Sequence, residues 1–245
     1  LSIACLFSTF LFYVMSLLRF IPSKSCKSTL CLLVTFLFVF AGIGAFVIND
    51  ISQAICHFVI ALTFGFVLVA LIYSFAHVSG AHFNPAVTIA FWSMGEFNKR
   101  NVIPYIAAQI IGAVLASLCL FYLLSENFSN VSEVSYLGAT IPSGSVSQSF
   151  GFEFILTFIL MIVICSSAVH GKATKDFAGL AIGLTVGLES MFAGPITGAS
   201  MNPARSIGPA IVSGNLEHLW VYVVATCLGA VLASMVFLRV FKSDN

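Results

Sequence analysis

Six long stretches with almost no charged residues dominate this sequence of 245 residues. Each stretch is close to the roughly 20 residues that an α-helix needs to cross the hydrocarbon core of a bilayer. Only 8% of the residues are charged and 60% are hydrophobic, whereas soluble domains carry about 25% charged residues. We therefore expect an all-α integral membrane protein. The same composition, with a net charge of +1, excludes a nucleic-acid-binding protein, a disordered regulator and an ordinary soluble enzyme.

The predicted membrane-spanning helices cover residues 29–48, 52–77, 102–124, 148–168, 177–192 and 219–240. Two further apolar stretches, 85–94 and 203–212, are too short to cross a bilayer. Backbone at membrane depth must be hydrogen-bonded within the protein or must line a wet cavity. These two stretches are therefore predicted to form half-membrane helices.

The sequence repeats itself once. GAHFNPA at residues 80–86 recurs as GASMNPA at 198–204, and GAVLAS at 112–117 recurs unchanged at 229–234. Each repeat, 29–124 and 148–240, holds three spans and one half-helix. Because three is odd, the second repeat enters the membrane from the opposite side, which gives an inverted repeat. The two half-helices then enter from opposite faces and meet near the midplane.

The matched boxes Asn84-Pro85-Ala86 and Asn202-Pro203-Ala204 have the chemistry of helix starts. Asn is a favoured N-cap, and Pro fits the first helical turn because its missing N–H is not needed there. At the membrane centre, the free backbone donors and positive dipole ends of the two helices face each other. An Asn side chain held there also offers N–H donors to a passing solute.

Charge distribution predicts the orientation in the membrane. Eight basic residues lie on one side of the predicted bundle: Lys24, Lys27, Lys99, Arg100, Lys172, Lys175, Arg239 and Lys242. The opposite loops contain Asp50, Glu126, Glu133 and Glu217 but no Lys or Arg. Because cytoplasmic loops retain positive charge, the C-terminus is expected in the cytoplasm, in a plasma (inner) membrane.

Residues 1–28 form an apolar N-terminal extension, and residues 29–245 are predicted to form one domain. The extension has three open interpretations: an uncleaved signal anchor, a cleaved signal peptide or a non-native segment. The seven cysteines are scattered through apolar stretches, and the five histidines are equally dispersed. No metal site, cofactor or cluster of nucleophile and base is therefore predicted.

SGAHFNPAVT at residues 79–88 and GASMNPARS at 198–206 resemble the two signature loops of the aquaporin, or major intrinsic protein, family. The resemblance covers about residues 29–240 and is nearest to bacterial aquaporins and plant nodulin-26-like channels. It implies a homotetramer with one pore in each subunit and no catalysed step. Water would pass in single file and accept hydrogen bonds from Asn84 and Asn202, while the facing dipole ends reject protons and ions.

The resemblance also assigns a selectivity constriction to Phe64, Ser190, Ala199 and Arg205. Strict water channels of this family usually combine Phe and Arg with His at the position of Ser190. A serine there widens the ring, and Ala199 adds only a methyl group. We therefore expect water to pass together with small uncharged solutes such as glycerol or urea.

Two more residues are predicted to support the pore. Glu153 matches the buried family glutamate that binds the backbone of a signature loop, whereas its repeat partner is Cys31. His82 is predicted to line the cytoplasmic vestibule, to sense pH or to pack within its loop. Glu189 adjoins Ser190 but points about 100° away from it on a helix, which favours an interhelical hydrogen bond over pore lining.

Two other functions remain as alternatives. A strict water channel is expected if the bulk of Phe64 outweighs the small residues of the constriction. A secondary transporter also uses inverted repeats and broken helices, but the spans contain no paired carboxylates for ion coupling.

Overall fold

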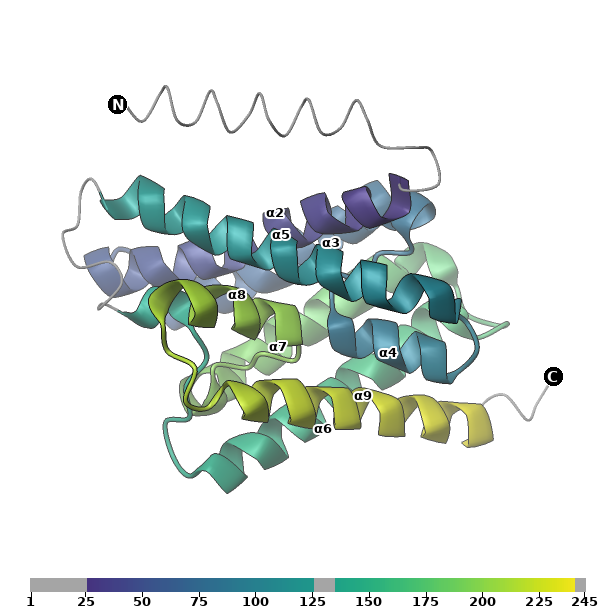
Figure 1. Cartoon of the computed structure of the whole chain (residues 1–245). Helices are drawn as coiled ribbons and strands as arrows, with labels where there is room; N and C mark the ends of the chain where they lie inside the picture. Colours follow the sequence, from purple (N-terminus) through teal and green to yellow (C-terminus); the bar gives the residue numbers. More distant parts are fainter. Residues whose placement is uncertain (1–25, 126–134, 241–245) are drawn as a thin grey trace.

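The structure, a computed structural model, describes residues 26–125 and 135–240 (Figure 1). Residues 1–25 of the predicted N-terminal extension lie outside the described residues. Within the described residues, six helices are long and apolar enough to cross a membrane. They are α2 (Cys26–Ser52), α3 (His57–Ser79), α5 (Lys99–Ser125), α6 (Val146–Ile164), α7 (Ala178–Thr197) and α9 (Leu219–Val240). The half-helices are α4 (Pro85–Ser93) and α8 (Pro203–Ser213), so the predicted fold class is confirmed.

The helix boundaries differ from the prediction at two informative places. The second span begins at His57 rather than at residue 52, because α2 continues to Ser52 and Gln53 then adopts a positive φ of 53°. The fifth span continues to Thr197 instead of ending at residue 192. Gly194 and Pro195 are weak helix formers by sequence, yet Pro195 lies inside α7.

Three short elements complete the described chain. A 3-10 turn, η2 (Ser135–Gly138), precedes α6. A π-helical turn, η3 (Cys165–Val169), extends α6, and a second 3-10 turn, η4 (Lys175–Phe177), leads into α7. Of these, η2 matters most for the site because it packs against α8.

The helices pack as two interlocked halves. Within the first repeat α2 packs on α5, and within the second α6 packs on α9, while α3 and α7 meet across the repeats. Each half-helix packs on the last helix of the other repeat, α4 on α9 and α8 on α5. In Figure 1, α4 and α8 accordingly lie between the α2–α5 pair and the α6–α9 pair.

Glycines allow the closest helix crossings. A methyl group added to Gly112 would overlap the carbonyl of Leu32, and one added to Gly229 would overlap the carbonyl of Phe154. Leu32 and Phe154 occupy equivalent positions of the two repeats, three residues before Thr35 and Thr157 respectively. The shared GAVLAS segment thus makes the same backbone-to-backbone contact twice, as small residues do in membrane helix pairs.

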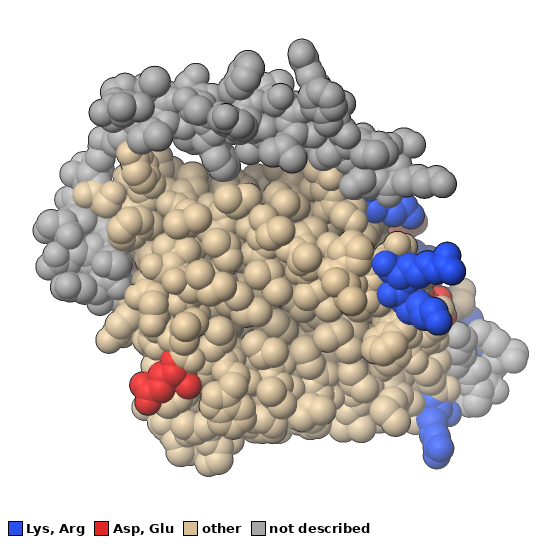
Figure 2. Space-filling view, in the orientation of Figure 1, with Lys and Arg blue, Asp and Glu red and all other residues tan. Residues whose placement is uncertain are grey.

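The outer surface is suited to lipid. Large apolar side chains point outward along the spans, among them Phe66 and Leu188, which are 56% and 60% exposed. Figure 2 shows the basic side chains gathered at one end of a surface that is otherwise almost uncharged. In the described part of the chain these residues are Lys27, Lys99, Arg100, Lys172, Lys175 and Arg239, all at the corresponding helix ends or connections. The chain is an integral, multi-pass membrane protein.

The glycine crossing gives a stability prediction. Gly229→Ala is expected to lower the free energy of unfolding by about 1–3 kcal/mol, because the new methyl group overlaps the Phe154 backbone. Unfolding of the detergent-solubilised protein measures the change. Gly151→Ala is the control, since a methyl group on Gly151 meets nothing within 4 Å. Equal stability of the two variants would contradict the packing argument.

Candidate functional site

The two half-helices begin where predicted and with the same capping geometry. Asn84 and Asn202 are both extended N-caps with φ of −151° and −152°, and each is followed by Pro at the first helical position. Asn84 Oδ1 accepts from the Ala86 N–H at 2.9 Å, and Asn202 Oδ1 accepts from the Ala204 N–H at 3.0 Å. Each asparagine oxygen therefore satisfies a backbone donor that a helix start leaves free.

The two asparagine amides also join the repeats. Asn84 Nδ2 donates to the Met201 carbonyl at 2.7 Å, and Asn202 Nδ2 donates to the Phe83 carbonyl at 2.9 Å. Phe83 directly precedes Asn84, and Met201 directly precedes Asn202. Both residues have a positive φ, of 49° and 53° respectively. Non-glycine residues in this left-handed conformation are costly and cluster at functional sites. These two reciprocal hydrogen bonds fix the two loops to each other.

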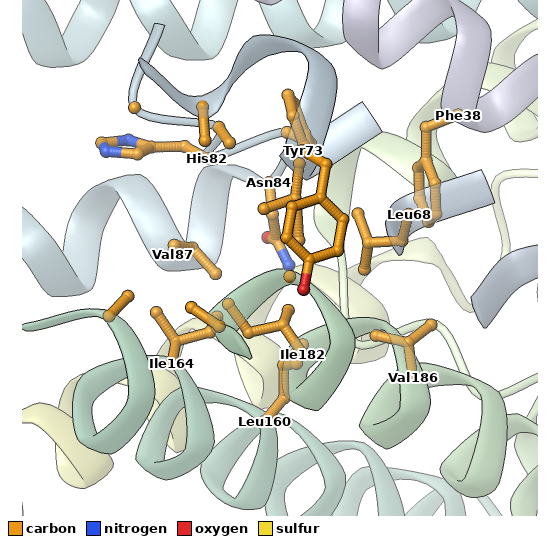
Figure 3. Close-up of a pocket in the computed structure, with 18 of the residues that line it drawn as sticks. Phe38, Leu68, Tyr73, His82, Asn84, Val87, Leu160, Ile164, Ile182 and Val186 are labelled. Carbon is orange, nitrogen blue, oxygen red and sulfur yellow. The ribbon is translucent and has the colours of Figure 1, made fainter. Parts of the chain in front are cut away.

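A cavity of about 560 Å³ leads to both asparagines. Its wall is mostly apolar; Figure 3 shows Phe38, Leu68, Leu160, Ile164, Ile182 and Val186 around Asn84. Lys175 and Asp176 also line it, so it opens toward the end that carries the basic residues. The cavity is therefore a passage from one membrane face to the junction of the half-helices.

The four residues assigned by resemblance to the constriction do not line this cavity. All four are buried. Ser190 lies one helical turn beyond the cavity-lining Val186 on α7, and Ala199 lies three residues before Asn202. The direct contact that the structure records within the set joins Arg205 and Phe64, with the guanidinium carbon 5.2 Å from the ring centroid.

Arg205 is held by a contact that sequence reasoning missed. Its Nη1 donates to the Gly138 carbonyl at 2.6 Å. Gly138 ends η2, 67 residues earlier in the chain, so no local pattern links the two residues. Nearby, Thr140 Oγ1 donates to Ser206 Oγ at 2.8 Å. Together these contacts tie the connection between α5 and α6 to the start of α8.

Glu153 organises the second signature loop. Its Oε1 accepts from the Ser200 N–H at 2.8 Å and from Thr197 Oγ1 at 2.7 Å, while Oε2 accepts from the Met201 N–H at 2.8 Å. Glu153 is fully buried. A carboxylate has acceptor sites on both oxygens and no donor in its ionised form, so one side chain satisfies two buried N–H groups of the loop and the hydroxyl of Thr197, the last residue of α7.

Cys31 occupies the equivalent position in the first repeat. Its thiol lies near the Phe83 backbone and the Gln109 side chain. Phe83 is the counterpart of Met201, so the cysteine lies near the same loop position that Glu153 binds. Because a thiol is a weak hydrogen-bonding group, the first loop is held less strongly from this helix. Gln109 adds a bond of 3.0 Å from its Nε2 to Thr88 Oγ1.

His82 is packed within the first signature loop. Its Nδ1 lies 3.1 Å from Thr88 Oγ1, and its ring contacts the rings of Phe91, Phe97 and Tyr105. It also borders the cavity. His82 lies in the loop after α3, outside the six spanning helices, where desolvation lowers its pKa from 6.5 to about 4. Its imidazole is therefore neutral at neutral pH.

The prediction for Glu189 is wrong. Its carboxyl is buried, yet neither oxygen has a hydrogen-bond partner in the described part of the chain. The interhelical bond expected from sequence is not formed. Glu189 follows Val186 by three residues and Ile182 by seven, so it shares the helix face of these two cavity-lining residues. The prediction considered only the angle between Glu189 and Ser190 on the helix and overlooked the face that Glu189 shares with Val186 and Ile182.

Two half-helices that meet end to end beside a buried passage, inside six spanning helices, define a membrane channel. Within the described residues no group of three or more His, Cys, Asp or Glu residues is suited to hold a metal ion.

Comparison with known proteins agrees with this class. Residues 23–237 match the family described as major intrinsic protein. Nodulin-26 of Glycine max is 45% identical over 212 residues, which cover 86% of this chain and 76% of the relative. Aquaporin NIP3-1 of Arabidopsis thaliana is 48% identical over 199 residues, covering 80% of this chain and 61% of the relative.

A solved structure has the same fold. The X-ray structure of the aquaglyceroporin from Plasmodium falciparum aligns with a TM-score of 0.75 and 27% sequence identity, covering 87% of this chain and 95% of that chain. This chain belongs to the major intrinsic protein family. It is a passive channel for water and small solutes and not an enzyme.

The two buried glutamates should respond oppositely to the same substitution. Glu153→Leu is expected to destabilise the fold, at about 1–3 kcal/mol for each buried donor left unpaired. Glu189→Leu loses no hydrogen bond and removes a buried polar group, so stability is expected to stay the same or to rise. Unfolding midpoints in detergent measure both. A loss with Glu189→Leu as large as that with Glu153→Leu would contradict the observed bonding.

His82 gives a prediction of pH dependence. Because its pKa in the folded protein is about 4, the unfolded chain binds the proton more tightly than the folded chain does. The stability that His82 contributes is complete above about pH 6.5 and is lost as the pH falls toward 4. The unfolding midpoint of His82→Gln should therefore fall less between about pH 7 and pH 4.5 than that of the wild type. His218→Gln, on a surface connection, is the control, and identical pH profiles of wild type and His82→Gln would refute the prediction.

Proposed function

We propose that this channel conducts water and small uncharged solutes, such as glycerol or urea, while excluding protons and other ions. The observation that carries this proposal is the exchange of hydrogen bonds between the two half-helix starts at the end of the cavity. Asn84 and Asn202 both border that cavity and are bound symmetrically.

The boxes Asn84-Pro85-Ala86 and Asn202-Pro203-Ala204 supply the central donors. Each asparagine NH₂ carries two hydrogens, and one of them is used in the bond to the opposite loop. The other hydrogen is the donor for a water molecule or a solute hydroxyl in passage. A solute that accepts a hydrogen bond first from one asparagine and then from the other has its oxygen oriented toward the half-helix starts.

Ion exclusion follows from the same arrangement. The half-helices present their positive N-terminal ends to the junction, which opposes a cation at that point. The cavity wall offers mainly aliphatic and aromatic side chains, so an ion entering it would lose hydration without replacement. An uncharged solute loses far less.

The proposed selectivity constriction consists of Phe64, Ser190, Ala199 and Arg205. It is proposed to lie on the far side of the two asparagines, away from the cavity. Arg205 supplies hydrogen-bond donors and a charge, and Phe64 supplies a bulky wall under the guanidinium. The small side chains of Ser190 and Ala199 leave more room than a histidine would. Glu153 and His82 are proposed as supporting residues because each binds within a signature loop.

We further propose one channel domain over residues 29–245, with repeats 29–124 and 148–240, that assembles as a homotetramer. The membership of the chain in the major intrinsic protein family supports the tetramer. The gathering of Lys and Arg at one end supports a cytoplasmic C-terminus, in a plasma (inner) membrane.

Stopped-flow light scattering on proteoliposomes tests the function. Vesicles carrying the channel should shrink faster than empty vesicles under an impermeant osmolyte and then recover under a glycerol gradient. Arg205→Val is the control for the constriction. Shrinkage without recovery would make this a strict water channel, and saturable uptake coupled to an ion gradient would make it a secondary transporter.

The same assay tests the size of the constriction. Ser190→His is expected to reduce glycerol permeability several-fold while water permeability persists, because the imidazole fills the space beside Phe64 and Arg205. Ser147→His, on the exposed start of α6, should leave both permeabilities unchanged. Unchanged glycerol flux in Ser190→His would remove Ser190 from the constriction.

A further inference from the structure

His57 connects α3 to the backbone of α7. It is the first residue of α3, and its Nε2 lies 3.0 Å from the Ser190 carbonyl and 3.0 Å from the Met191 carbonyl. Carbonyl oxygens only accept hydrogen bonds. The ring nitrogen between them must therefore carry the hydrogen and donate it to both.

The sequence of α7 explains why one of these carbonyls needs a donor from outside. In an α-helix the Met191 carbonyl would accept from the N–H of residue 195. Residue 195 is Pro, which has no N–H, and it lies inside the helix. The imidazole of His57 supplies the missing donor.

Gly194, the residue directly before Pro195, makes room for the ring. A methyl group added to Gly194 would lie 2.5 Å from His57 Cε1 and 3.1 Å from His57 Nε2. Even alanine at position 194 would therefore displace the imidazole. His57, Gly194 and Pro195 form one fitted joint between the two helices.

This joint lies next to the proposed constriction. Ser190 belongs to the constriction, and its carbonyl is one of the two that His57 binds. On α3, Phe64 follows His57 by seven residues, which is close to two helical turns and places both on one face. Phe64 in turn lies under Arg205. One side chain thus ties the helix that carries Phe64 to the backbone that carries Ser190.

A second contact between α3 and α7 makes this tie effective. Next to Phe64, a methyl group on Gly65 would lie 2.9 Å from the Gly183 carbonyl, so the helices touch there. The two helices are held together at the Gly65 crossing and again at His57, about two turns nearer the start of α3. Loss of the His57 bond leaves the Ser190 end of α7 free to move relative to α3.

We propose that His57 is a positioning residue that sets the separation of Phe64 and Ser190 and so limits the size of the solute that passes. This inference rests on the proposed assignment of Phe64, Ser190 and Arg205 to the constriction. His57 acts through the α7 backbone.

The test is the ratio of glycerol to water permeability in proteoliposomes, which does not depend on how much protein is reconstituted. His57→Leu is expected to raise this ratio by at least about threefold, because the opening widens. His57→Gln keeps an N–H donor of similar reach and should restore the wild-type ratio. His218→Leu, a histidine on the connection before α9, should leave the ratio unchanged.

A double variant separates positioning from general damage. In Pro195→Ala, residue 195 regains its N–H and can pair with the Met191 carbonyl inside the helix. In this Pro195→Ala background, His57→Leu should change the ratio of glycerol to water permeability by less than half as much as it does in the wild-type background. If His57→Leu does not assemble, His57→Asn replaces it, since its amide is too short to reach the carbonyls.

The outcomes are distinct. An unchanged ratio in His57→Leu, failure of His57→Gln to restore the ratio, or an equal effect with and without Pro195 would each overturn the proposal. A wild-type channel that conducts neither water nor glycerol would instead overturn the proposed function. A conducting wild type with an unaltered His57→Leu ratio leaves the function intact and removes only the role of His57.

Discussion

Backbone groups inside a membrane cannot be left without partners, because no water is present in the hydrocarbon core to bind them. Two loops of this chain run through that region, each between a spanning helix and a half-helix. Asn84 and Asn202 supply these partners. Each asparagine caps its own half-helix and donates a hydrogen bond to the carbonyl of the residue directly before the other asparagine. The junction, the passage beside it and the interlocked packing of the two repeats all depend on this exchange.

The two repeats share this geometry but support it differently. In the second repeat a carboxylate, Glu153, binds two backbone donors of the loop and the hydroxyl of Thr197 at the end of α7. In the first repeat Cys31 takes its place, and His82 and Gln109 both contact the hydroxyl of Thr88. His82 and Thr88 correspond to Ser200 and Ser206, which also contact each other. The same pair of positions is therefore linked in both repeats, by imidazole and hydroxyl in one and by two hydroxyls in the other.

The proposed constriction is joined to parts of the chain that lie far from it in sequence. Arg205 is oriented by the carbonyl of Gly138 and lies over Phe64, and Ser190 is reached by His57. Solute selection in such a pore is a matter of a few tenths of a nanometre in width and a few donors. Its control therefore rests on these connections as much as on the four side chains themselves.

The sequence alone was enough for the six spans, the two half-helices, the inverted repeat and the asparagine caps. These features depend on segment length, on local capping chemistry and on the odd number of crossings in each repeat, all of which can be counted along the chain. Only the tertiary structure decided that Gly138 binds Arg205, that Cys31 lies near Phe83, that His57 binds α7 and that Glu189 has no hydrogen-bond partner among the residues the structure describes. Each of these depends on the rotation of one helix or loop relative to another that is distant in sequence, and local periodicity carries no information about that rotation.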